Sequence, residues 1–348
     1  MKLLIITQKV DRNDPILGFF HGWIIEFSHH VENIKVICLE QGEVNLPTNV
    51  RVFSLGKERT PSRFRYVLNF YYYLWRLRDE YDTVFVHMNQ EYVLLAGWWW
   101  RLSGKKILFW RNHHAGNLLT NLAVIFCHKI FCTSRYSYTA KFKKNVLMPV
   151  GINLNIFNPG GERNDFYKGK ILFLARLAPV KKPEILISAL KKLVKEGVNF
   201  EASFYGDFLP VDRTWAEILK KDIADSDLSD RLTFYLGISN DQTPKVYRGH
   251  EIFVNLSSSG MYDKTIFEAM ACGCLVLACN RNLIGEIDER FIFEEDNVGD
   301  LAEKIKNLLR LSSEEKKILG EDLKKYVFEH HSLELLSQKL ITNLEELK

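Results

Sequence analysis

The stretch IFVNLSSSGMYDKTIFEAMACGCLVLA, residues 252–278, carries the pattern that decides the fold. An apolar, β-branched run ends in three serines, a glycine loop follows, a helix-length segment begins near Asp263, and a second apolar run starts at Leu275. The order strand, loop, helix, strand is typical of a βα unit in a parallel sheet. We therefore expect an α/β domain around this stretch.

The same alternation extends over the rest of the chain. Helix-length segments with apolar residues at helical spacing, such as residues 20–31 and 64–78, lie between several short apolar runs. This pattern predicts two parallel sheets with helices on both faces. The strands are expected at residues 3–6, 34–39, 50–55, 83–87, 106–110 and 129–133 in the first half, and at 171–175, 200–205, 232–235, 252–256 and 275–278 in the second.

A segment rich in Gly, Asn and Pro interrupts both periodicities between the two halves. We expect one Rossmann-like domain over residues 1–150, a linker over 151–168 and a second Rossmann-like domain over 169–328. The last residues, 329–348, form a leucine-striped helix that should pack back on a domain. Two such sheets would face a cleft, and ligands bind open parallel sheets at the carboxyl ends of their strands.

Composition is typical of globular domains, with 348 residues of which 47% are hydrophobic. The opening MKLLIIT suggests a strand rather than a signal peptide, and no apolar stretch reaches the roughly 20 residues that a spanning helix needs. The six cysteines lie mostly in apolar runs without the spacing of a zinc site or a disulfide framework. We therefore expect a cytoplasmic protein with buried thiols and no metal site.

Positive charge is concentrated in the first half, where residues 101–150 contain nine basic side chains and no acidic one. Residues 62–78, SRFRYVLNFYYYLWRLR, and 97–106, GWWWRLSGKK, interleave basic residues with aromatics. Such segments are typical of proteins that lie on an anionic membrane surface, here the inner face of the membrane, although a core helix with a basic outer face gives a similar pattern. No nucleic-acid-binding module is evident, so nucleic acid is not an expected partner.

The helix expected near Asp263 offers a site for an anion. Free N–H groups of its first turn and the helix dipole favour a phosphate beside Lys264 and Thr265, and the small residues up to Gly260 allow close approach. Glu268 lies one turn further on, where a carboxylate can accept hydrogen bonds from vicinal hydroxyls such as those of a ribose. Taken alone, these residues also fit an ordinary loop followed by a solvated glutamate.

Residues 257–278 resemble the signature of the retaining GT-B glycosyltransferases, in particular the GT4-type family of group 1 glycosyl transferases, whose EAMA helix corresponds to residues 268–276. FLARLAPVKKP at 173–183 is similar to another segment of that family, which implies that Arg176 and Lys181 hold the donor pyrophosphate. Two permanent cations suit a diphosphate. The resemblance implies a GT-B fold with an acceptor-binding N-terminal domain and a C-terminal domain for a nucleotide diphosphate sugar.

Further segments extend the resemblance. FYGD at 204–207 and RLTFYLG at 231–237 are similar to two strands of the donor domain, and FWRNHH at 109–114 implies a histidine that contacts sugar or takes part in catalysis, with a capping or core histidine as the alternative. The expected donor-binding residues are Gly18, Arg176, Lys181, Gly206, Gly237, Ile238, Gly260, Asp263, Lys264, Thr265 and Glu268, and the expected catalytic residues are His113, His114, Arg176 and Lys181.

The chain departs from the family at Gly260, which stands where the E-x7-E motif has its first glutamate. Asp263 or backbone amides would then take over contacts to the sugar hydroxyls. The DSD sequence at 225–227 lies in a polar segment, so we expect neither a metal nor a cofactor. The implied function is retaining transfer of a sugar from a nucleotide diphosphate sugar to a glycan or lipid-linked acceptor. A non-catalytic nucleotide-sugar-binding scaffold and a GT-B-like sugar-nucleotide epimerase are the alternatives.

Overall fold

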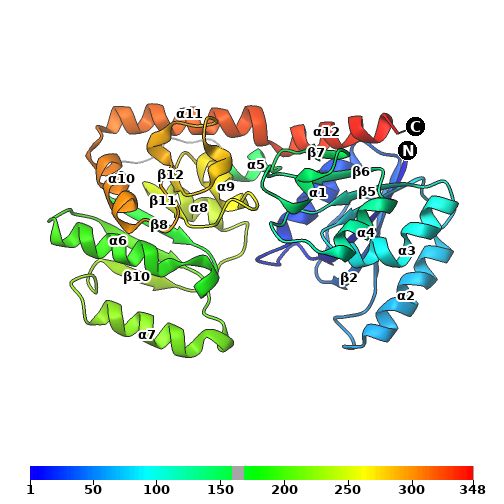
Figure 1. Cartoon of the computed structure of the whole chain (residues 1–348), viewed down its shortest axis with the longest axis horizontal. Helices are drawn as coiled ribbons and strands as arrows, with labels where there is room; N and C mark the ends of the chain where they lie inside the picture. Colours follow the sequence, from blue (N-terminus) through cyan, green and yellow to red (C-terminus); the bar gives the residue numbers. More distant parts are fainter. Residues whose placement is uncertain (159–167, 348) are drawn as a thin grey trace. The chain divides into compact units, whose positions relative to one another are not determined.

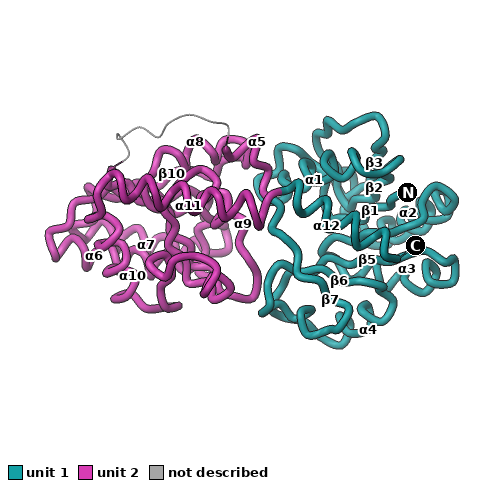
Figure 2. Tube along the Cα trace, turned by 90° about the horizontal axis from the view of Figure 1, so that it is seen from above, with its two compact units in different colours: residues 1–151, 333–348 teal, residues 152–332 magenta. Residues whose placement is uncertain are grey.

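The computed structural model describes residues 1–158 and 168–347, and the chain divides into two compact units (Figures 1 and 2). Unit 1 comprises residues 1–151 and 333–348, drawn in teal in Figure 2, and unit 2 comprises residues 152–332, drawn in magenta. Residues 159–167 of the expected linker and Lys348 of the expected C-terminal helix lie outside the described residues.

The described part of unit 1 contains a seven-stranded sheet with the order β3-β2-β1-β4-β5-β6-β7, in which all pairs are parallel. Short β-branched and aromatic runs form most of these strands as the sequence predicts, and the central strands β1, β4 and β5 are buried on both faces. The edge strand β7 is absent from the sequence-based expectation. The strands are β1 (Lys2–Val10), β2 (Asn33–Gln41), β3 (Val50–Ser54), β4 (Thr83–His87), β5 (Lys106–Trp110), β6 (Lys129–Cys132) and β7 (Asn145–Leu147).

Helices cover both faces of this sheet because successive side chains of a strand point to opposite sides. On β1, Leu3 and Ile5 pack with α1 (Gly18–Ser28) and α12 (Leu333–Glu345), whereas Leu4 and Ile6 pack on the other side of the sheet. That second side is covered by α2 (Arg63–Arg76), α3 (Gln90–Leu102) and α4 (Leu118–Phe126). Unit 1 is therefore a three-layer α/β unit whose first layer includes a helix from the far end of the chain.

The chain leaves the first sheet at Gly151, which has a φ of 76° in the left-handed region. A Cβ at this position would lie 2.6 Å from the Leu336 side chain, and the Gly151 carbonyl accepts a hydrogen bond from Trp23 Nε1 at 3.1 Å. A glycine is thus needed where α1 and α12 meet the backbone. The leucine stripe of α12 is buried against unit 1 through Leu333, Leu336, Leu340 and Leu344.

The described part of unit 2 contains a five-stranded parallel sheet with the order β10-β9-β8-β11-β12. Its strands are β8 (Lys170–Leu174), β9 (Glu201–Tyr205), β10 (Leu232–Tyr235), β11 (Ile252–Asn255) and β12 (Leu275–Ala278). Its helices are α5 (Leu154–Phe157), α6 (Pro183–Lys195), α7 (Arg213–Ala224), α8 (Thr243–Arg248), α9 (Lys264–Ala271), α10 (Val298–Arg310) and α11 (Ser313–His331). Helices α6 and α10 pack together, as do α9 and α11.

Burial follows the sequence pattern in most places. All six cysteines are buried. Of the three consecutive tryptophans, Trp100 is fully buried and donates to the Tyr81 hydroxyl at 3.0 Å, whereas Trp98 is 51% exposed. Consecutive positions on a helix cannot all face one core, which explains the difference. Among the described residues, no helix combines the length and the apolar character that a membrane-spanning helix requires.

Candidate functional site

The candidate site lies in unit 2 at the point where the order of the strands reverses. Strand β8 connects onward to β9 on one side, and β11 pairs with β8 on the other side. The loops that follow β8 and β11 therefore leave the sheet side by side at its carboxyl edge, the place where ligands bind doubly wound sheets. These loops are residues 175–182 and 256–263, and they contain Arg176, Lys181 and Asp263.

Asp263 forms the N-cap of α9. Its Oδ1 accepts hydrogen bonds from the Thr265 backbone N–H at 3.3 Å and from the Thr265 hydroxyl at 2.8 Å. An aspartate before a helix satisfies N–H groups that lack partners within the helix, which explains why α9 begins here. The Thr265 hydroxyl also accepts from Asn255 Nδ2 at 3.1 Å, so the end of β11 is tied to the first turn of α9.

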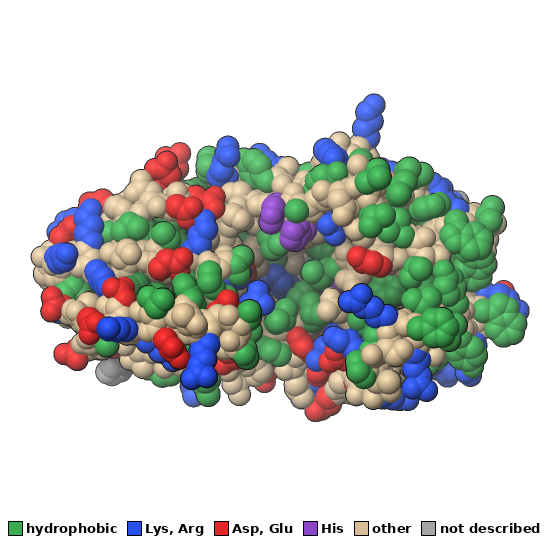
Figure 3. All heavy atoms as spheres, turned by 60° about the horizontal axis from the view of Figure 1, so that its bottom comes forward, with side chains coloured by type: hydrophobic (Ala, Val, Ile, Leu, Met, Phe, Trp, Pro, Cys, Tyr) green, Lys and Arg blue, Asp and Glu red, His purple; other side chains and the backbone are tan. Residues whose placement is uncertain are grey.

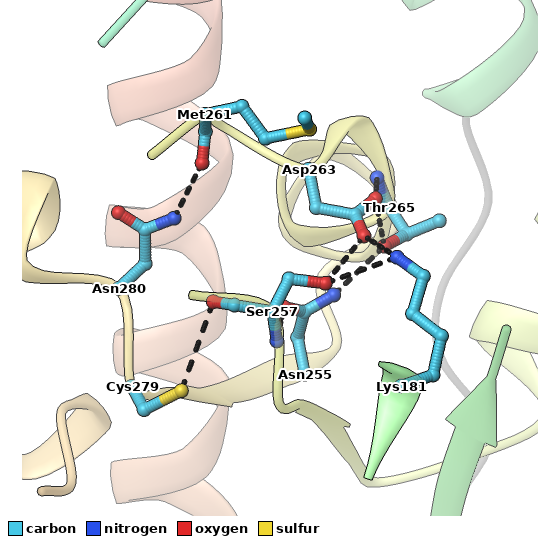
Figure 4. A network of polar contacts seen from close by, with 8 residues as sticks. All are labelled: Lys181, Asn255, Ser257, Met261, Asp263, Thr265, Cys279 and Asn280. Carbon is cyan, nitrogen blue, oxygen red and sulfur yellow. Dashed lines mark hydrogen bonds and ion pairs between the residues drawn. The ribbon is translucent and has the colours of Figure 1, made fainter. Parts of the chain in front are cut away.

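A polar network joins the two loops (Figure 4). Lys181 Nζ donates to Ser257 Oγ at 3.1 Å and to Asp263 Oδ2 at 2.8 Å, and Ser257 Oγ donates to the same carboxylate oxygen at 2.8 Å. Lys181 reaches this point from the short 3-10 turn Pro179–Lys181, while Ser257 and Asp263 come from the opposite loop. The network fixes the positions of the two loops relative to each other.

The network stabilises the ionised form of Asp263. Burial alone would raise the pKa of the carboxyl group, but the Lys181 ammonium and the hydrogen bonds from Ser257 and Thr265 outweigh burial and hold the pKa well below its usual range. Asp263 is therefore an anion at neutral pH, and Lys181 lies against it as a cation. Part of the positive charge of Lys181 is already balanced within the protein.

The loop of residues 257–263 is also anchored from behind by two asparagines after β12. Asn280 Nδ2 donates to the Met261 carbonyl at 2.8 Å, and Asn282 Nδ2 donates to the Ser259 carbonyl at 2.8 Å. The Tyr262 hydroxyl donates to the Asn282 carbonyl at 3.0 Å. With the Ser259 and Met261 carbonyl groups bonded to these asparagines, the loop has a fixed course past Gly260, where the family motif has a glutamate.

Arg176 differs from Lys181 in having no internal partner. Its side chain is exposed at the end of β8, and within the described residues its guanidinium makes no hydrogen bond and no ion pair. A guanidinium binds a phosphate or carboxylate with two parallel hydrogen bonds. At the strand-order reversal, Arg176 is a cation that remains available to an anionic ligand.

Glu268 lies inside the protein, with 3% of its surface exposed. Its Oε1 accepts from Asn240 Nδ2 at 3.3 Å, and its Oε2 accepts from the Tyr247 hydroxyl at 3.3 Å. Burial raises the pKa of the carboxyl group, and the Lys264 charge and the hydrogen bond from Asn240 oppose that rise. The carboxylate is thus oriented by two side chains and keeps further acceptor positions for a ligand hydroxyl.

Lys264 is the first residue of α9 and lies one turn before Glu268. Burial lowers the pKa of the lysine to about 8, and the Glu268 charge opposes this effect. An anion bound at the start of α9 would stabilise the charged ammonium and raise this pKa. Lys264 therefore adds a second titratable cation to the same end of the sheet.

The loops after β9 and β10 complete the carboxyl edge. A Cβ on Gly206 would lie 1.9 Å from the Ala175 carbonyl oxygen, so only glycine permits the two loops to pass this closely. Asp207 Oδ1 accepts from the Gly237 N–H at 3.0 Å, and a Cβ on Gly237 would lie 2.5 Å from that carboxylate. Ile238 follows directly and is half-buried. The predicted glycines thus fix the backbone next to Arg176.

The expected residues of unit 1 form a separate set. Gly18 is the first residue of α1, and a Cβ there would lie 3.1 Å from the Arg12 carbonyl oxygen. His113 and His114 are exposed in the loop after β5, with their rings stacked at 4.5 Å between centroids. His113 Nδ1 lies 2.9 Å from the Ala115 backbone nitrogen and accepts a hydrogen bond from its N–H.

Several residues of the site were not expected from the sequence. Asn240 and Tyr247 hold Glu268, and Ser257 lies between Lys181 and Asp263. Only Ser257 had a local signal, as a small polar residue at the end of a strand. The acidic residues Asp225 and Asp227 follow α7 and are exposed, away from any strand end.

Comparison with solved structures identifies the fold. HepE from Anabaena, solved in complex with UDP and glucose, superposes with a TM-score of 0.77 at 16% sequence identity, and the match covers 99% of this chain and 99% of HepE. With two parallel sheets in two α/β units, the protein has the GT-B fold of glycosyltransferases.

The sequence comparisons identify the family of the second half. Residues 162–326 match the model described as Glycosyl transferases group 1, so the chain carries a domain of that family. Spore coat protein SA of Bacillus subtilis is 26% identical over 51% of this chain and 48% of its own length. The D-inositol 3-phosphate glycosyltransferase of Segniliparus rotundus is 29% identical over 40% of this chain and 33% of its own length. The chain thus spans about half, or less, of the curated relatives that it matches.

Proposed function

We propose that the protein is a retaining glycosyltransferase that transfers a hexosyl group from a nucleoside diphosphate sugar to a glycan or lipid-linked acceptor. The observation that carries the proposal is the convergence of Arg176, Lys181 and the start of α9 at the strand-order reversal of unit 2. A diphosphate bound there would meet a guanidinium, an ammonium and the positive end of the α9 helix dipole. HepE, whose fold is the same, binds UDP and glucose, so a uridine donor is the first to test.

The chemistry that these residues support is departure of a diphosphate. The acceptor hydroxyl oxygen forms a bond to the anomeric carbon on the face from which the diphosphate leaves, and the bond from that carbon to the phosphate oxygen breaks. The hydroxyl proton passes to an oxygen of the leaving diphosphate, so the anomeric configuration is retained. Arg176, Lys181 and the α9 N-terminus stabilise the negative charge that develops on the leaving group, a task that a metal ion performs in other transferases.

The contacts to the sugar hydroxyls differ from those of the family because Gly260 replaces the first glutamate. Asp263 is committed to Lys181, Ser257 and Thr265, which favours backbone N–H groups of the 257–263 loop over Asp263 as the replacement. Glu268, held by Asn240 and Tyr247, is assigned to a hydroxyl pair of the donor. We assign His113 and His114 to contacts with the transferred sugar or to catalysis, and Gly18 to binding of the donor.

The test combines donor binding with turnover. UDP and UDP-glucose are titrated by calorimetry and thermal shift against the native chain, Arg176→Ala and the control Arg310→Ala, which removes an exposed arginine from α10. Arg176→Ala should weaken UDP binding about ten- to a hundredfold, the loss expected for hydrogen bonds to a charged group, and Arg310→Ala should not. Other nucleoside diphosphate sugars are screened in the same way.

Turnover separates the proposal from its alternatives. A transferase hydrolyses bound donor slowly without acceptor, and proton NMR of the released or transferred sugar should report the donor's own anomeric configuration. An inverted product contradicts the retaining mechanism. Donor binding without any turnover on a panel of glycan and lipid-linked acceptors favours a scaffold, and conversion of the donor into an epimer favours an epimerase. Turnover that persists in EDTA supports the assignment of the charge-stabilising role to Arg176 and Lys181.

A further inference from the structure

Helix α2 in unit 1 carries two apolar stripes. Its inner stripe includes Phe70 and Leu74, which are buried in the core of the unit. Its outer stripe recurs at helical spacing and faces solvent, and it consists of Phe64, Val67, Leu68, Tyr71, Tyr72 and Trp75. The sequence-based alternative of a core helix with a basic outer face is therefore incomplete, because Phe64, Val67 and Tyr71 do not face the core.

Helices α3 and α4 extend this exposed surface. The Tyr71 hydroxyl donates to the Leu95 carbonyl of α3 at 2.9 Å, and a Cβ on Gly97 would lie 2.8 Å from the Phe126 ring of α4, so the three helices pack side by side. On the face drawn in Figure 3, hydrophobic side chains gather over unit 1, at the right of the picture, with Lys and Arg beside them. We call the surface formed by the outer stripe of α2 with Trp98, Leu102, Leu118, Leu119, Leu122 and Ile125 the outer apolar face.

The three helices of the outer apolar face carry a single acidic residue, although Asp79, Glu80 and Asp82 follow α2 and Asp79 pairs with Arg78 at 3.4 Å. Helices α2 and α4 contain no acidic residue, and α3 contains only Glu91. The guanidinium groups of Arg76 and Arg78 lie over the rings of Tyr72 and Trp75, at 6.0 and 4.8 Å from the ring centres. The basic residues within α2, α3 and α4 are Arg63, Arg65, Arg76 and Arg101, and Arg78 and Lys105 lie just beyond the ends of α2 and α3.

We propose that the outer apolar face docks unit 1 on the surface of an anionic lipid bilayer. Aromatic and aliphatic side chains would enter the boundary between headgroups and acyl chains, while the arginines, on long apolar stems, reach the lipid phosphates. Exposed apolar surface of this extent on a soluble domain marks an interaction site. The two features together, apolar contact and positive charge, match the two components of an anionic membrane surface.

A second copy of the chain fits this face less well. A two-fold dimer places the same patch on both sides of its interface, where α2 and α4 offer no acidic residue to the arginines and Asp79 already pairs with Arg78 of its own chain. An anionic bilayer provides the opposite charge. The inference goes beyond the proposed transferase reaction and does not depend on the donor site in unit 2.

The experiment is vesicle flotation with the full-length chain at low ionic strength. Vesicles contain either phosphatidylcholine alone or equal parts phosphatidylcholine and phosphatidylglycerol. The apolar variant is Phe64→Ser with Trp75→Ser. Its matched control is Phe328→Ser with Ile218→Ser, because Phe328 on α11 is 66% exposed and Phe64 is 74% exposed, yet Phe328 lies in unit 2. A charge variant replaces Arg63, Arg65 and Arg76 by Gln.

The native chain should float with the mixed vesicles and bind phosphatidylcholine vesicles at least tenfold more weakly. The apolar variant and the charge variant should each lose at least tenfold in partition to the mixed vesicles, while the unit 2 control binds as the native chain does. Absence of binding to the mixed vesicles overturns the proposal, as does an equal loss in the control. A native dimer that the apolar variant converts to monomers, seen by light scattering, assigns the face to a contact between copies instead. UDP titration of each variant reports separately on the donor site.

Discussion

Lys181 Nζ lies 2.8 Å from Asp263 Oδ2, although the two residues are 82 positions apart in the sequence. This ion pair connects the loop after β8 to the residue that caps α9, and Ser257 shares the same carboxylate oxygen. The two loops of the site are therefore positioned relative to each other by the folded protein, and the binding of a diphosphate needs little rearrangement of them.

Replacement of Asp263 by Ala should lower the free energy of unfolding by about 2–4 kcal/mol, because it removes a helix cap and leaves the Lys181 ammonium without its anionic partner. The effect should be measured by urea denaturation at neutral pH. Asp222→Ala serves as the control, since it removes the exposed partner of Lys191 and should cost at most about 1 kcal/mol. Equal losses in the two variants would show that the Lys181–Asp263 pair behaves as an ordinary surface pair.

The Tyr247→Phe variant tests how Glu268 is held. The buried Tyr247 hydroxyl donates to Glu268 Oε2, and its removal should cost about 1–3 kcal/mol of stability and also weaken UDP binding. Tyr81→Phe is the matched control, because Tyr81 is equally buried but its hydroxyl accepts from Trp100 in unit 1. Tyr81→Phe should destabilise the protein without changing UDP affinity. If Tyr247→Phe also leaves UDP affinity unchanged, the orientation of Glu268 does not matter to the donor.

Gly206→Ala should damage the site through the backbone. The added Cβ would overlap the Ala175 carbonyl oxygen, so the loop that carries Arg176 must shift. We expect a loss of at least about 2 kcal/mol in stability and about tenfold weaker UDP binding. Gly197→Ala, at a φ of 73° with open space around it, should cost only the left-handed backbone penalty of about 1–2 kcal/mol and leave UDP binding unchanged. Calorimetric titration of both variants decides between these outcomes.

Stability should fall in mild acid because of His331. Burial, with a smaller effect from the charge of His330, lowers the pKa of His331 to about 3, and its ring lies 4.3 Å from the ring of Phe267 on α9. In the unfolded chain the imidazole takes up a proton below about pH 6.5, whereas the native chain excludes that proton until about pH 3. The stability that the neutral His331 ring contributes is therefore fully present above about pH 6.5. It is lost as the pH falls from about 6.5 toward 3, and at pH 5 the free energy of unfolding is lower by about 2 kcal/mol.

Urea denaturation between neutral pH and pH 5 measures this slope. His331→Leu should flatten the curve by about the same 2 kcal/mol, whatever its stability at neutral pH. His30→Leu removes an exposed imidazole from unit 1 and should leave the slope as it is in the native chain. An unchanged slope in His331→Leu would mean that other groups account for the acid sensitivity.

Much of the fold could be predicted because strands buried on both faces leave continuous apolar runs in the sequence. Strand β7 was missed because it has only three residues, which are too few for a periodic signal, and lies at the edge of the sheet. The stripe of α12 showed that the helix has an apolar side, but a stripe does not tell which sheet it will cover. On α2 the residues that point outward are as apolar as those that point inward, so periodicity alone could not separate Phe64 from Phe70.

In the candidate site, too, some residues could be predicted from the sequence and others could not. Arg176, Lys181 and Glu268 lie in segments with a recognisable pattern, and a resemblance could select them. Asn240 and Tyr247 are ordinary polar residues in an irregular loop and a short helix, and only the three-dimensional path of the chain brings them to Glu268. The pairing of Lys181 with Asp263 could likewise not be predicted, because no sequence pattern links residues of two loops that meet only at the edge of the sheet.

Helix α12 belongs to unit 1, yet it is synthesised only after the whole of unit 2. Trp23 and Phe27 of α1 and the layer formed by Leu336 and Leu340 cannot come together until the whole of unit 2 has left the ribosome. During translation, the apolar side of unit 1 that α12 covers therefore stays exposed while about 180 further residues are added. A ribosome that stalls within unit 2 would leave this apolar flank of unit 1 uncovered and accessible to chaperones and proteases.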